Sequence, residues 1–451
     1  MNNNKWEFLE SNAPARVVGA LKKLNAFFDG RKLAEWAGNL YDPEIGGFYY
    51  SNSARDTEGY APDLESTWQT LTLLSSFGGI SSLNAIPDDI KEKIVKFTKS
   101  TQSPVDGYFY HPQWPQGKEN LQSDRYGRDM GWACALIKNL KPYGEDQYPD
   151  YCTPTGTKCK AHADNDDNCF KKSVPAASSV ETAPVQRRPQ DPDYSSREAF
   201  CAWLEEYEKD IKIASGNAHM LAALRDEIVA KGYGNDILDF YDRIQAELYE
   251  EQISAGIEPT GVWQTNMDYH VVWGVWKHLY YYNYGPISRP INLKYVPYMV
   301  RSCVKVLMMK IDRWHAMNDL FNQWVSIGAI IDNVRRHHGE EAVMVVYDIV
   351  RESAAELVDA TIEKISPFKL DDGTVVYCSN GLGMKSIYGV PIAEGVREGD
   401  ANGVGLWCSM YNAVFKCLGY PVVKIMDESD GERFIEIIKN RQPIVKHPSN
   451  R

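Results

Sequence analysis

The feature that most constrains the fold is a glycine–aromatic turn that recurs along the chain, each time shortly before a helix-like run of residues. The turns lie at Gly46–Phe48, Gly107–Tyr108, Gly261–Trp263 and Gly373–Tyr377. Gly47 and Gly107 are 60 positions apart, and Gly261 and Gly373 are 112 apart, about twice 56. A helix, a loop and a second helix fill such an interval, and a repeated spacing is typical of repeat architectures. The pattern predicts repeated helical hairpins.

Apolar residues between the turns follow the helical period. Ile90, Ile94 and Phe97 belong to one stripe, and Val343–Val358 carries another, whereas strand signals are confined to short pieces beside the glycines. We therefore expect a nearly all-α protein, an α/α toroid of repeated helical hairpins with short β-turn segments at the loop end. Residues 1–451 are predicted to form this single domain, with the inner helices around a cavity.

One segment, residues 143–196, interrupts the rhythm because it is rich in Pro, Asp, Ser and Thr and lacks apolar periodicity. Loops of this length are uncommon inside a compact domain. We interpret it as a flexible insertion between hairpins. Its Cys152, Cys159, His162 and Cys169 are residue types that bind zinc, but their spacing matches no standard zinc-finger pattern, so the prediction is no metal and zinc stays an open alternative.

Charge and hydropathy limit the possible partners. The net charge of −12 opposes a general affinity for nucleic acid or anionic membranes, which depends on clustered Lys and Arg. No stretch reaches the apolar length of a membrane span, the first residues lack the apolar core of a secretion signal, and the nine cysteines are scattered. We expect a cytoplasmic protein with no cofactor, no nucleic-acid partner and no membrane partner, and the oligomeric state stays open.

Polar residues gather where the glycine turns lead into helices, which is the end at which a toroid opens its cavity. Asp63 and Glu65 flank one predicted helix start, where a carboxylate either caps the helix or serves as an acid or base. Glu398 and Asp400 flank another start, with the same two alternatives. In a third motif, a His beside a Tyr, Tyr269 and His270 form a proton-transfer pair or a structural contact.

The remaining motif places aromatic residues that can stack on a sugar ring beside charged groups, from Tyr108 to Asp129. Together the motifs give two sets of candidates. The predicted catalytic residues are Asp63, Glu65, His111, Tyr269, His270, Glu398 and Asp400. The predicted substrate-binding residues are Tyr108, Tyr110, Trp114, Arg128, Asp129, Trp263 and Asn402. Four of them, Asp63, His111, His270 and Asp400, are predicted to face one cavity.

On the motifs Gly46–Phe48, Pro62–Thr67, Asp106–Tyr110 and Glu398–Asn402, the chain resembles the α/α-toroid superfamily. This group includes terpenoid cyclase and prenyltransferase-like proteins and the six-hairpin carbohydrate-active enzymes, and the layout is nearest to bacterial proteins similar to heparinase-like lyases and related glycoside hydrolases. The resemblance implies an active site in the cavity at one end of the ring.

The leading hypothesis is a carbohydrate-active enzyme, a glycoside hydrolase or a lyase, that acts on short, possibly uronate-containing oligosaccharides. Hydrolysis needs two carboxyl groups, here Asp63 or Glu65 opposite Glu398 or Asp400. Elimination would instead use Tyr269 or His270, or Tyr108 with His111, beside a substrate carboxylate neutralised by Arg128. The alternatives are a terpenoid cyclase-like or isoprenoid-binding toroid, which needs a dry aromatic cavity, and a non-catalytic scaffold ring.

Overall fold

The computed structural model describes residues 2–111, 123–140, 147–157, 159–160, 192–213, 218–264, 275–283, 293–311, 315–381, 386–387, 390–391 and 396–448. Helices dominate these residues. The named strands among them are β1 (Ser386–Ile387) and β2 (Val390–Pro391), which pair antiparallel with Ser386 opposite Pro391. The expected all-α class is therefore confirmed, whereas closure into a toroid stays a prediction.

The chain divides into two compact units, each made of several separate segments. Unit 1 comprises Met1–Phe27, Pro192–Pro367 and Leu406–Val423, and unit 2 comprises Phe28–Asp191, Phe368–Gly405 and Lys424–Arg451. The single domain predicted for residues 1–451 is not tested by this division. Of the predicted insertion 143–196, only residues 147–157, 159–160 and 192–196 lie among those described.

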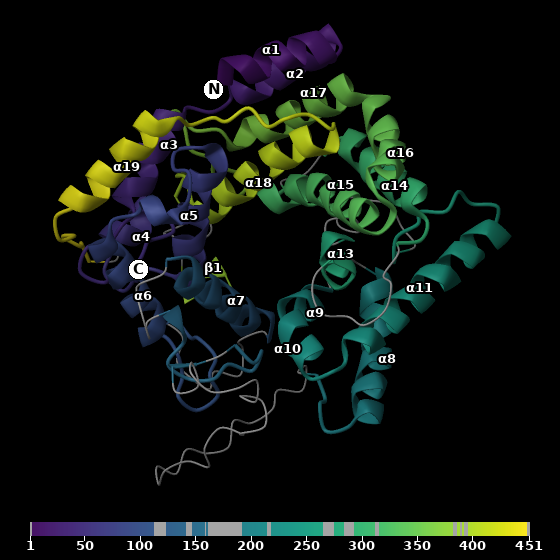
Figure 1. Cartoon of the computed structure of the whole chain (residues 1–451), viewed down its shortest axis with the longest axis horizontal. Coiled ribbons are helices and arrows are strands. Elements are labelled where there is room, and N and C mark those ends of the chain that lie inside the picture. Colours follow the sequence, from purple (N-terminus) through teal and green to yellow (C-terminus); the bar gives the residue numbers. More distant parts are fainter. Residues whose placement is uncertain are drawn as a thin grey trace. The chain divides into compact units, whose positions relative to one another are not determined.

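Unit 1 is built around the long helix α15 (Met317–His338), which packs against α13 (Val275–Asn283), α14 (Val296–Met308) and α16 (Glu340–Arg351) (Figure 1). Its buried side chains recur at helical spacing, as at Leu320, Trp324, Ile327 and Ile331, so one face supplies the contacts. The other described helices of unit 1 are α1 (Asn2–Asn12), α2 (Ala15–Asn25), α8 (Arg197–Ile213), α9 (His219–Ala223), α10 (Arg225–Ala230), α11 (Gly234–Ser254) and α17 (Ala354–Ile365).

The apolar stripe predicted over Val343–Val358 belongs to two helices instead of one. The chain turns at Glu352 and Ser353, so the stripe is divided between α16 and α17. The apolar residues keep the helical period on both sides of the turn because each helix buries one face, α16 against α15 and α17 against α2. The short 3-10 turn η5 (Ser366–Phe368) and α18 (Ala401–Cys417) contribute residues to both units.

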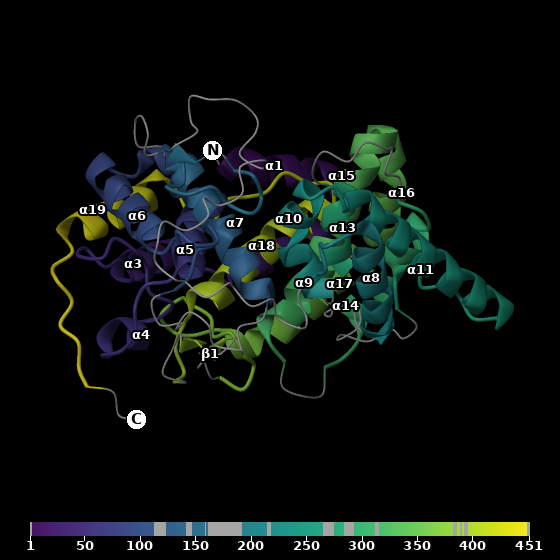
Figure 2. The same ribbon diagram turned by 90° about the horizontal axis from the view of Figure 1, so that it is seen from below.

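Unit 2 contains α3 (Gly30–Asn39), α4 (Asn52–Asp56), α5 (Leu64–Phe77), the 3-10 turn η1 (Leu83–Ala85), α6 (Asp88–Ser100), α7 (Ser123–Asn139) and α19 (Glu428–Asn440). Helices α3 and α19 lie side by side although they are far apart in the sequence (Figures 1 and 2). A glycine allows close approach here, because a Cβ at Gly38 of α3 would lie 3.0 Å from Cγ2 of Ile437 in α19. Helix α19 also lies close to the residues that follow α5, where a Cβ at Gly431 would lie 1.6 Å from the carbonyl oxygen of Gly79. Helix α7 packs against both α5 and α6.

Three of the recurring glycine turns are closed by isolated antiparallel bridges, all in unit 2. The bridges join Tyr41 to Phe48, Gln102 to Phe109, and Lys369 to Val375. Gly46, Gly107 and Gly373 have φ values of 90°, 76° and 86° inside these turns, which glycine adopts without strain. In each turn an aspartate accepts hydrogen bonds from residues further along, as Asp42 does from the hydroxyl of Tyr49 at 2.7 Å and Asp106 from that of Tyr110 at 2.8 Å. The repeated sequence pattern is thus a repeated local structure.

None of the described helices combines the length and the apolar character that are needed to cross a membrane.

Candidate functional site

The start of α5 in unit 2 carries two predicted catalytic carboxylates. Asp63 precedes the helix, and its carboxylate accepts the backbone N–H of Glu65 at 2.7 Å, as an N-capping residue does. The glycine turn before it is fastened to the same helix, because the backbone N–H of Phe48 donates to Thr67 Oγ1 at 3.0 Å and Ser66 Oγ donates to the Phe48 carbonyl at 2.6 Å. Turn and helix start therefore form one rigid piece.

Arg125 of α7 joins these carboxylates into what we call the Arg125 cluster, namely Asp63, Glu65, Arg125 and Asp129. Its guanidinium donates from Nη2 to both oxygens of Asp63, at 2.8 and 2.9 Å, and also contacts Glu65 Oε2 and, one helical turn away, Asp129 at 3.2 Å. The four side chains are between 0% and 3% exposed, so water does not screen their charges. Tyr50 adds a hydrogen bond from its hydroxyl to Glu65 Oε2 at 2.6 Å.

The environment separates the protonation states inside the Arg125 cluster. Burial acts to raise the pKa of Asp63, but the nearby charge of Arg125, with help from His111 and hydrogen bonds, outweighs it and the pKa is lowered. Burial raises the pKa of Asp129 well above its ordinary value, and neighbouring Asp63 and Glu65 add to this effect. The environment therefore favours the ionised form of Asp63 and the protonated form of Asp129.

His111 lies against the same cluster. Its Nε2 is 3.7 Å from Asp63 Oδ2 and 2.8 Å from the carbonyl oxygen of Pro62, so this nitrogen carries the hydrogen and donates to the carbonyl. Burial lowers the pKa of His111 in spite of the neighbouring Asp63, so the ring is neutral at pH 7. The contact with Asp63 is then a dipole contact rather than an ion pair.

Glu398 and Asp400, the Glu398–Asp400 pair, lie before α18. Asp400 is 0% exposed, and its Oδ1 accepts the N–H of Gly403 at 2.8 Å. Within the described residues its second oxygen, Oδ2, has no hydrogen-bond partner. Burial, with the charge of Glu398, raises the pKa of Asp400 to about 7. Glu398 is half-buried and accepts the N–H of Ser53 at 2.9 Å, and burial raises its pKa as well.

Hydrogen bonds connect the Arg125 cluster to the start of α18. Gln69 Nε2 donates to Glu65 Oε1 at 3.2 Å and to Asn402 Oδ1 at 2.9 Å. The N–H of Ala401 also donates to the carbonyl of Tyr50 at 2.7 Å. The structure thus brings Asp63, Glu65, His111 and Asp129 together and links them to Asn402, two residues beyond Asp400.

The other predicted residues of unit 2 lie at neighbouring positions. The ring of Tyr108 meets that of Tyr126 edge-on, with 4.5 Å between centroids, and Tyr110 donates to Asp106 within its own turn. The guanidinium of Arg128 lies over the ring of Trp132, 5.1 Å from its centroid. The ring of Trp132 also lies 5.4 Å from Arg125, so α7 places an aromatic ring beside the Arg125 cluster.

Trp263, by contrast, lies in the core of unit 1. It is 0% exposed, its Nε1 donates to the carbonyl of Tyr241 at 3.0 Å, and its ring packs against His278. The structure therefore gives Trp263 a packing role in place of the predicted substrate contact.

Five of the residues discussed from the sequence, Trp114, Tyr269, His270, His162 and Cys169, lie outside the described residues. Of the four possible zinc ligands, Cys152 and Cys159 are described, with 2.7 Å between their sulfur atoms. In the described part of the chain, no three His, Cys, Asp or Glu side chains are grouped so as to hold a metal ion.

Three residues of the site were not predicted: Arg125, Tyr50 and Gln69. For Arg125 a signal existed, because Arg125 and Asp129 are spaced i, i+4 and share one face of a helix. Tyr50 and Gln69 carry no comparable local signal.

Comparison of the chain with models of protein families, with curated proteins and with solved structures finds no match. Function is therefore inferred from the chemistry of the site itself.

Proposed function

We propose that the chain is a cytoplasmic carbohydrate-active enzyme, specifically a glycoside hydrolase that acts on short oligosaccharides. The observation that carries the proposal is that the pKa values of two carboxyl groups of the site shift in opposite directions. Arg125 lowers the pKa of Asp63 against the effect of burial, whereas burial raises the pKa of Asp400 to about 7. Glycoside hydrolysis uses one protonated and one ionised carboxyl group. Environments that separate pKa values in this way assign such roles.

Hydrogen bonding favours Glu65 over Asp63 as the carboxyl group that acts on the substrate. Both oxygens of Asp63 are occupied by Arg125, and Oδ1 also caps α5, so Asp63 acts as a positioning residue. Glu65 Oε1 accepts only a 3.2 Å bond from Gln69 within the described residues, which leaves lone-pair capacity for a water molecule or a sugar carbon. Glu65 is accordingly assigned as base or nucleophile.

Asp400 is assigned as the general acid. Its pKa of about 7 keeps much of it protonated at neutral pH, and its Oδ2 has no partner among the described residues. Among Asp63, Glu65, Glu398 and Asp400, Glu398 is the least buried. A substrate would therefore reach Asp400 from the side of Glu398.

Of the bases expected for elimination, His111 is not suited to take a proton from a sugar through its nitrogen nearest Asp63, because that nitrogen donates to Pro62. Tyr269 and His270 lie outside the described residues, so the choice of hydrolysis over elimination rests on the paired carboxyl groups and is tested below by the products. A terpenoid cyclase would need an apolar site, and a scaffold would not need paired ionisable groups, so the charged cluster favours the hydrolase over both. We further infer that the hairpins close into an α/α toroid, for which the repeated bridged turns of unit 2 are the support.

The test compares the wild type with Glu65→Gln, Asp400→Asn and the matched control Glu432→Gln, whose carboxylate is exposed on α19. Each is incubated with a panel of neutral and uronate-containing oligosaccharides, and both new reducing ends and absorbance from new double bonds are followed. We expect reducing ends without double bonds, a loss of about 100-fold or more in kcat for the two site variants, and an unchanged control.

New double bonds in the product would show that the reaction is elimination and not hydrolysis. Full activity in Glu65→Gln and Asp400→Asn, with circular dichroism showing that both are folded, would contradict the site assignment. A folded wild type that cleaves nothing in the panel would favour the non-catalytic scaffold.

A further inference from the structure

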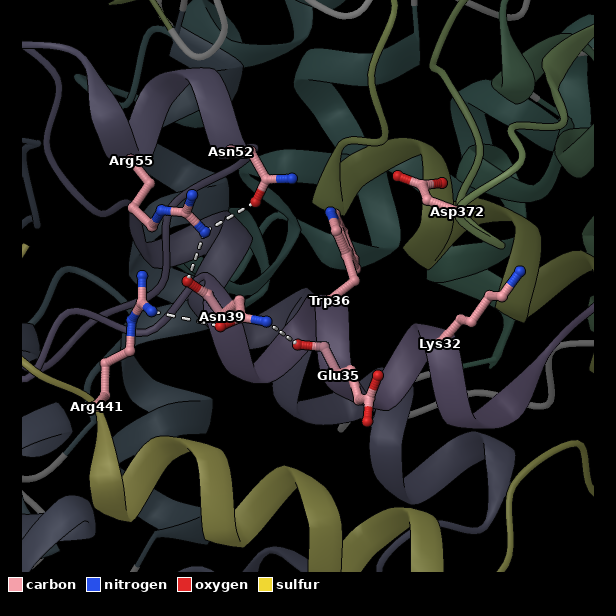
Figure 3. Close-up of a pocket in the computed structure, with 8 residues that line it drawn as sticks. All are labelled: Lys32, Glu35, Trp36, Asn39, Asn52, Arg55, Asp372 and Arg441. Carbon is pink, nitrogen blue, oxygen red and sulfur yellow. Dashed lines mark hydrogen bonds between the residues drawn. The ribbon is translucent and has the colours of Figure 1, made fainter. Parts of the chain in front are cut away.

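Unit 2 also contains a pocket of about 580 Å³ that shares no residue with the Arg125 cluster or the Glu398–Asp400 pair. It is lined by Lys32, Glu35, Trp36, Asn39, Asn52, Arg55, Asp372 and Arg441 (Figure 3). The lining comes from α3, α4, the glycine turn at Gly373 and the residue that follows α19. A pocket of this size accommodates a molecule as large as a mono- or disaccharide.

The cation most available to a ligand is Arg441. Its Nη1 donates to Asn39 Oδ1 at 3.3 Å, and its Nε is buried without a hydrogen-bond partner within the described residues. Arg441 forms no ion pair with any carboxylate in that part of the chain, whereas Arg55 binds the carboxylate of Asp56 through two bonds of 2.6 Å. One arginine of the pocket is thus neutralised and the other is not.

The two arginines lie on the same wall of the pocket. Figure 3 shows both guanidinium groups beside Asn39, where Arg55 donates to the backbone carbonyl oxygen at 3.1 Å and Arg441 to the side-chain oxygen at 3.3 Å. Burial, and then the positive charge of Arg55, lower the pKa of Arg441, which means that the two cations disfavour each other. A bound anion would relieve this repulsion.

A buried donor lies on the pocket floor. Trp36 is 7% exposed, and its Nε1 has no hydrogen-bond partner among the described residues (Figure 3). Buried donors are normally satisfied, so an unpaired indole N–H on a side chain that lines a pocket is a candidate donor to an acceptor supplied from outside. Glu35 does not fill this role, since its carboxylate pairs with Arg433 at 3.0 Å and Arg31 at 3.4 Å.

We propose that this pocket binds a small organic anion whose carboxylate or phosphate oxygens are held by Arg441 and the indole N–H of Trp36. Lys32 and Asp372, on the opposite wall, contact the polar remainder of the ligand. The proposal goes beyond the hydrolase assignment and does not depend on it, because the two sites have no residue in common.

Isothermal titration calorimetry at low salt tests the proposal with three probes, namely glucuronate, glucose 6-phosphate and neutral glucose. The variants are Arg441→Gln, Trp36→Phe and the control Lys439→Gln, which removes the same charge from an exposed position on α19. We expect at least one anionic probe to bind the wild type and Lys439→Gln equally, while glucose does not bind. Arg441→Gln weakens that binding about 10- to 100-fold, and Trp36→Phe weakens it about five- to tenfold.

The choice between glucuronate and glucose 6-phosphate identifies the anion as a carboxylate or a phosphate. Absence of binding by both anions, equal binding by Arg441→Gln and the wild type, or equally tight binding of glucose would each overturn the proposal. If Arg441→Gln does not fold, Trp36→Phe decides, because phenylalanine is smaller but keeps an apolar aromatic ring at this position and has no N–H donor. Anion binding by Glu65→Gln at wild-type affinity keeps this test separate from that of the hydrolase.

Discussion

Replacing Arg125 with methionine would remove the cation that contacts three buried carboxyl groups, those of Asp63, Glu65 and Asp129. Methionine fills a similar volume, so the packing of α7 against α5 is kept while Asp63, Glu65 and Asp129 lose their partner. Removing one member of a buried ion pair typically costs about 3–5 kcal/mol, because the remaining charge is uncompensated. We expect a loss of about that size in the free energy of unfolding of unit 2 at pH 7.

The loss should depend on pH in a defined direction. In the wild type the folded-state pKa of Asp63 is lowered, so its contribution is present above the unfolded pKa and is lost as the pH falls. Without the charge of Arg125, burial and the neighbouring carboxylates outweigh the remaining hydrogen bond from the N–H of Glu65, and the folded-state pKa of Asp63 rises. The variant then loses stability as the pH rises above about 4. The difference in free energy of unfolding between the wild type and Arg125→Met therefore becomes smaller toward acidic pH.

Urea unfolding followed by circular dichroism at about pH 7.5 and about pH 4.5 measures both effects, and hydrogen exchange in α5 assigns the transition to unit 2. The control is Arg31→Met, whose exposed ion pair with Glu35 is worth about 1 kcal/mol or less. A loss in Arg125→Met no larger than in this control, or one that does not change with pH, would refute the reasoning.

Three further substitutions test other parts of unit 2. The folded-state pKa of Asp400 is about 7, whereas its ordinary value is 3.8, so the free energy of unfolding of the wild type should fall by up to about 4 kcal/mol as the pH rises from 3.8 to 7. In urea titrations from pH 5 to 8, Asp400→Asn should not show this fall, and at pH 8 it should be no less stable than the wild type. Gly431→Ala would place a Cβ against the backbone of Gly79 and should cost about 3 kcal/mol, seen as a lower urea midpoint. Tyr50→Phe removes the hydroxyl donor to Glu65 and should cost about 2 kcal/mol in the same assay; an unchanged midpoint would contradict the importance of that bond.

The parts of the site that the sequence predicts are those with a local cause. Asp63 and Asp400 each precede a helix, and an aspartate at such a position is recognisable because capping involves only the next few residues. The glycine turns are recognisable for the same reason, since a positive φ and a short bridge are settled within one loop. Repetition of the local pattern then predicts the helical class.

The parts that the sequence does not reveal depend on contacts between distant segments. Arg125 and Arg128 stand one turn apart, and which of them meets the carboxylates is decided by how α7 is rotated against α5. Trp263 follows a glycine turn like the aromatics of unit 2, but its ring is buried by His278 and its N–H by Tyr241. The anion pocket combines Trp36 with Arg441, and no local pattern relates positions so far apart.

The two units are interleaved along the chain, and this order has a consequence for biosynthesis. Unit 1 needs Leu406–Val423 and unit 2 needs Lys424–Arg451, so neither is complete until translation has passed residue 405. At ordinary translation rates, roughly 10–50 s pass between the synthesis of Phe28–Asp191 and that of Lys424–Arg451, the last segment of unit 2. During that delay the apolar face of α3 has no α19 to cover it, and a nascent chain in this state is a natural client for chaperones.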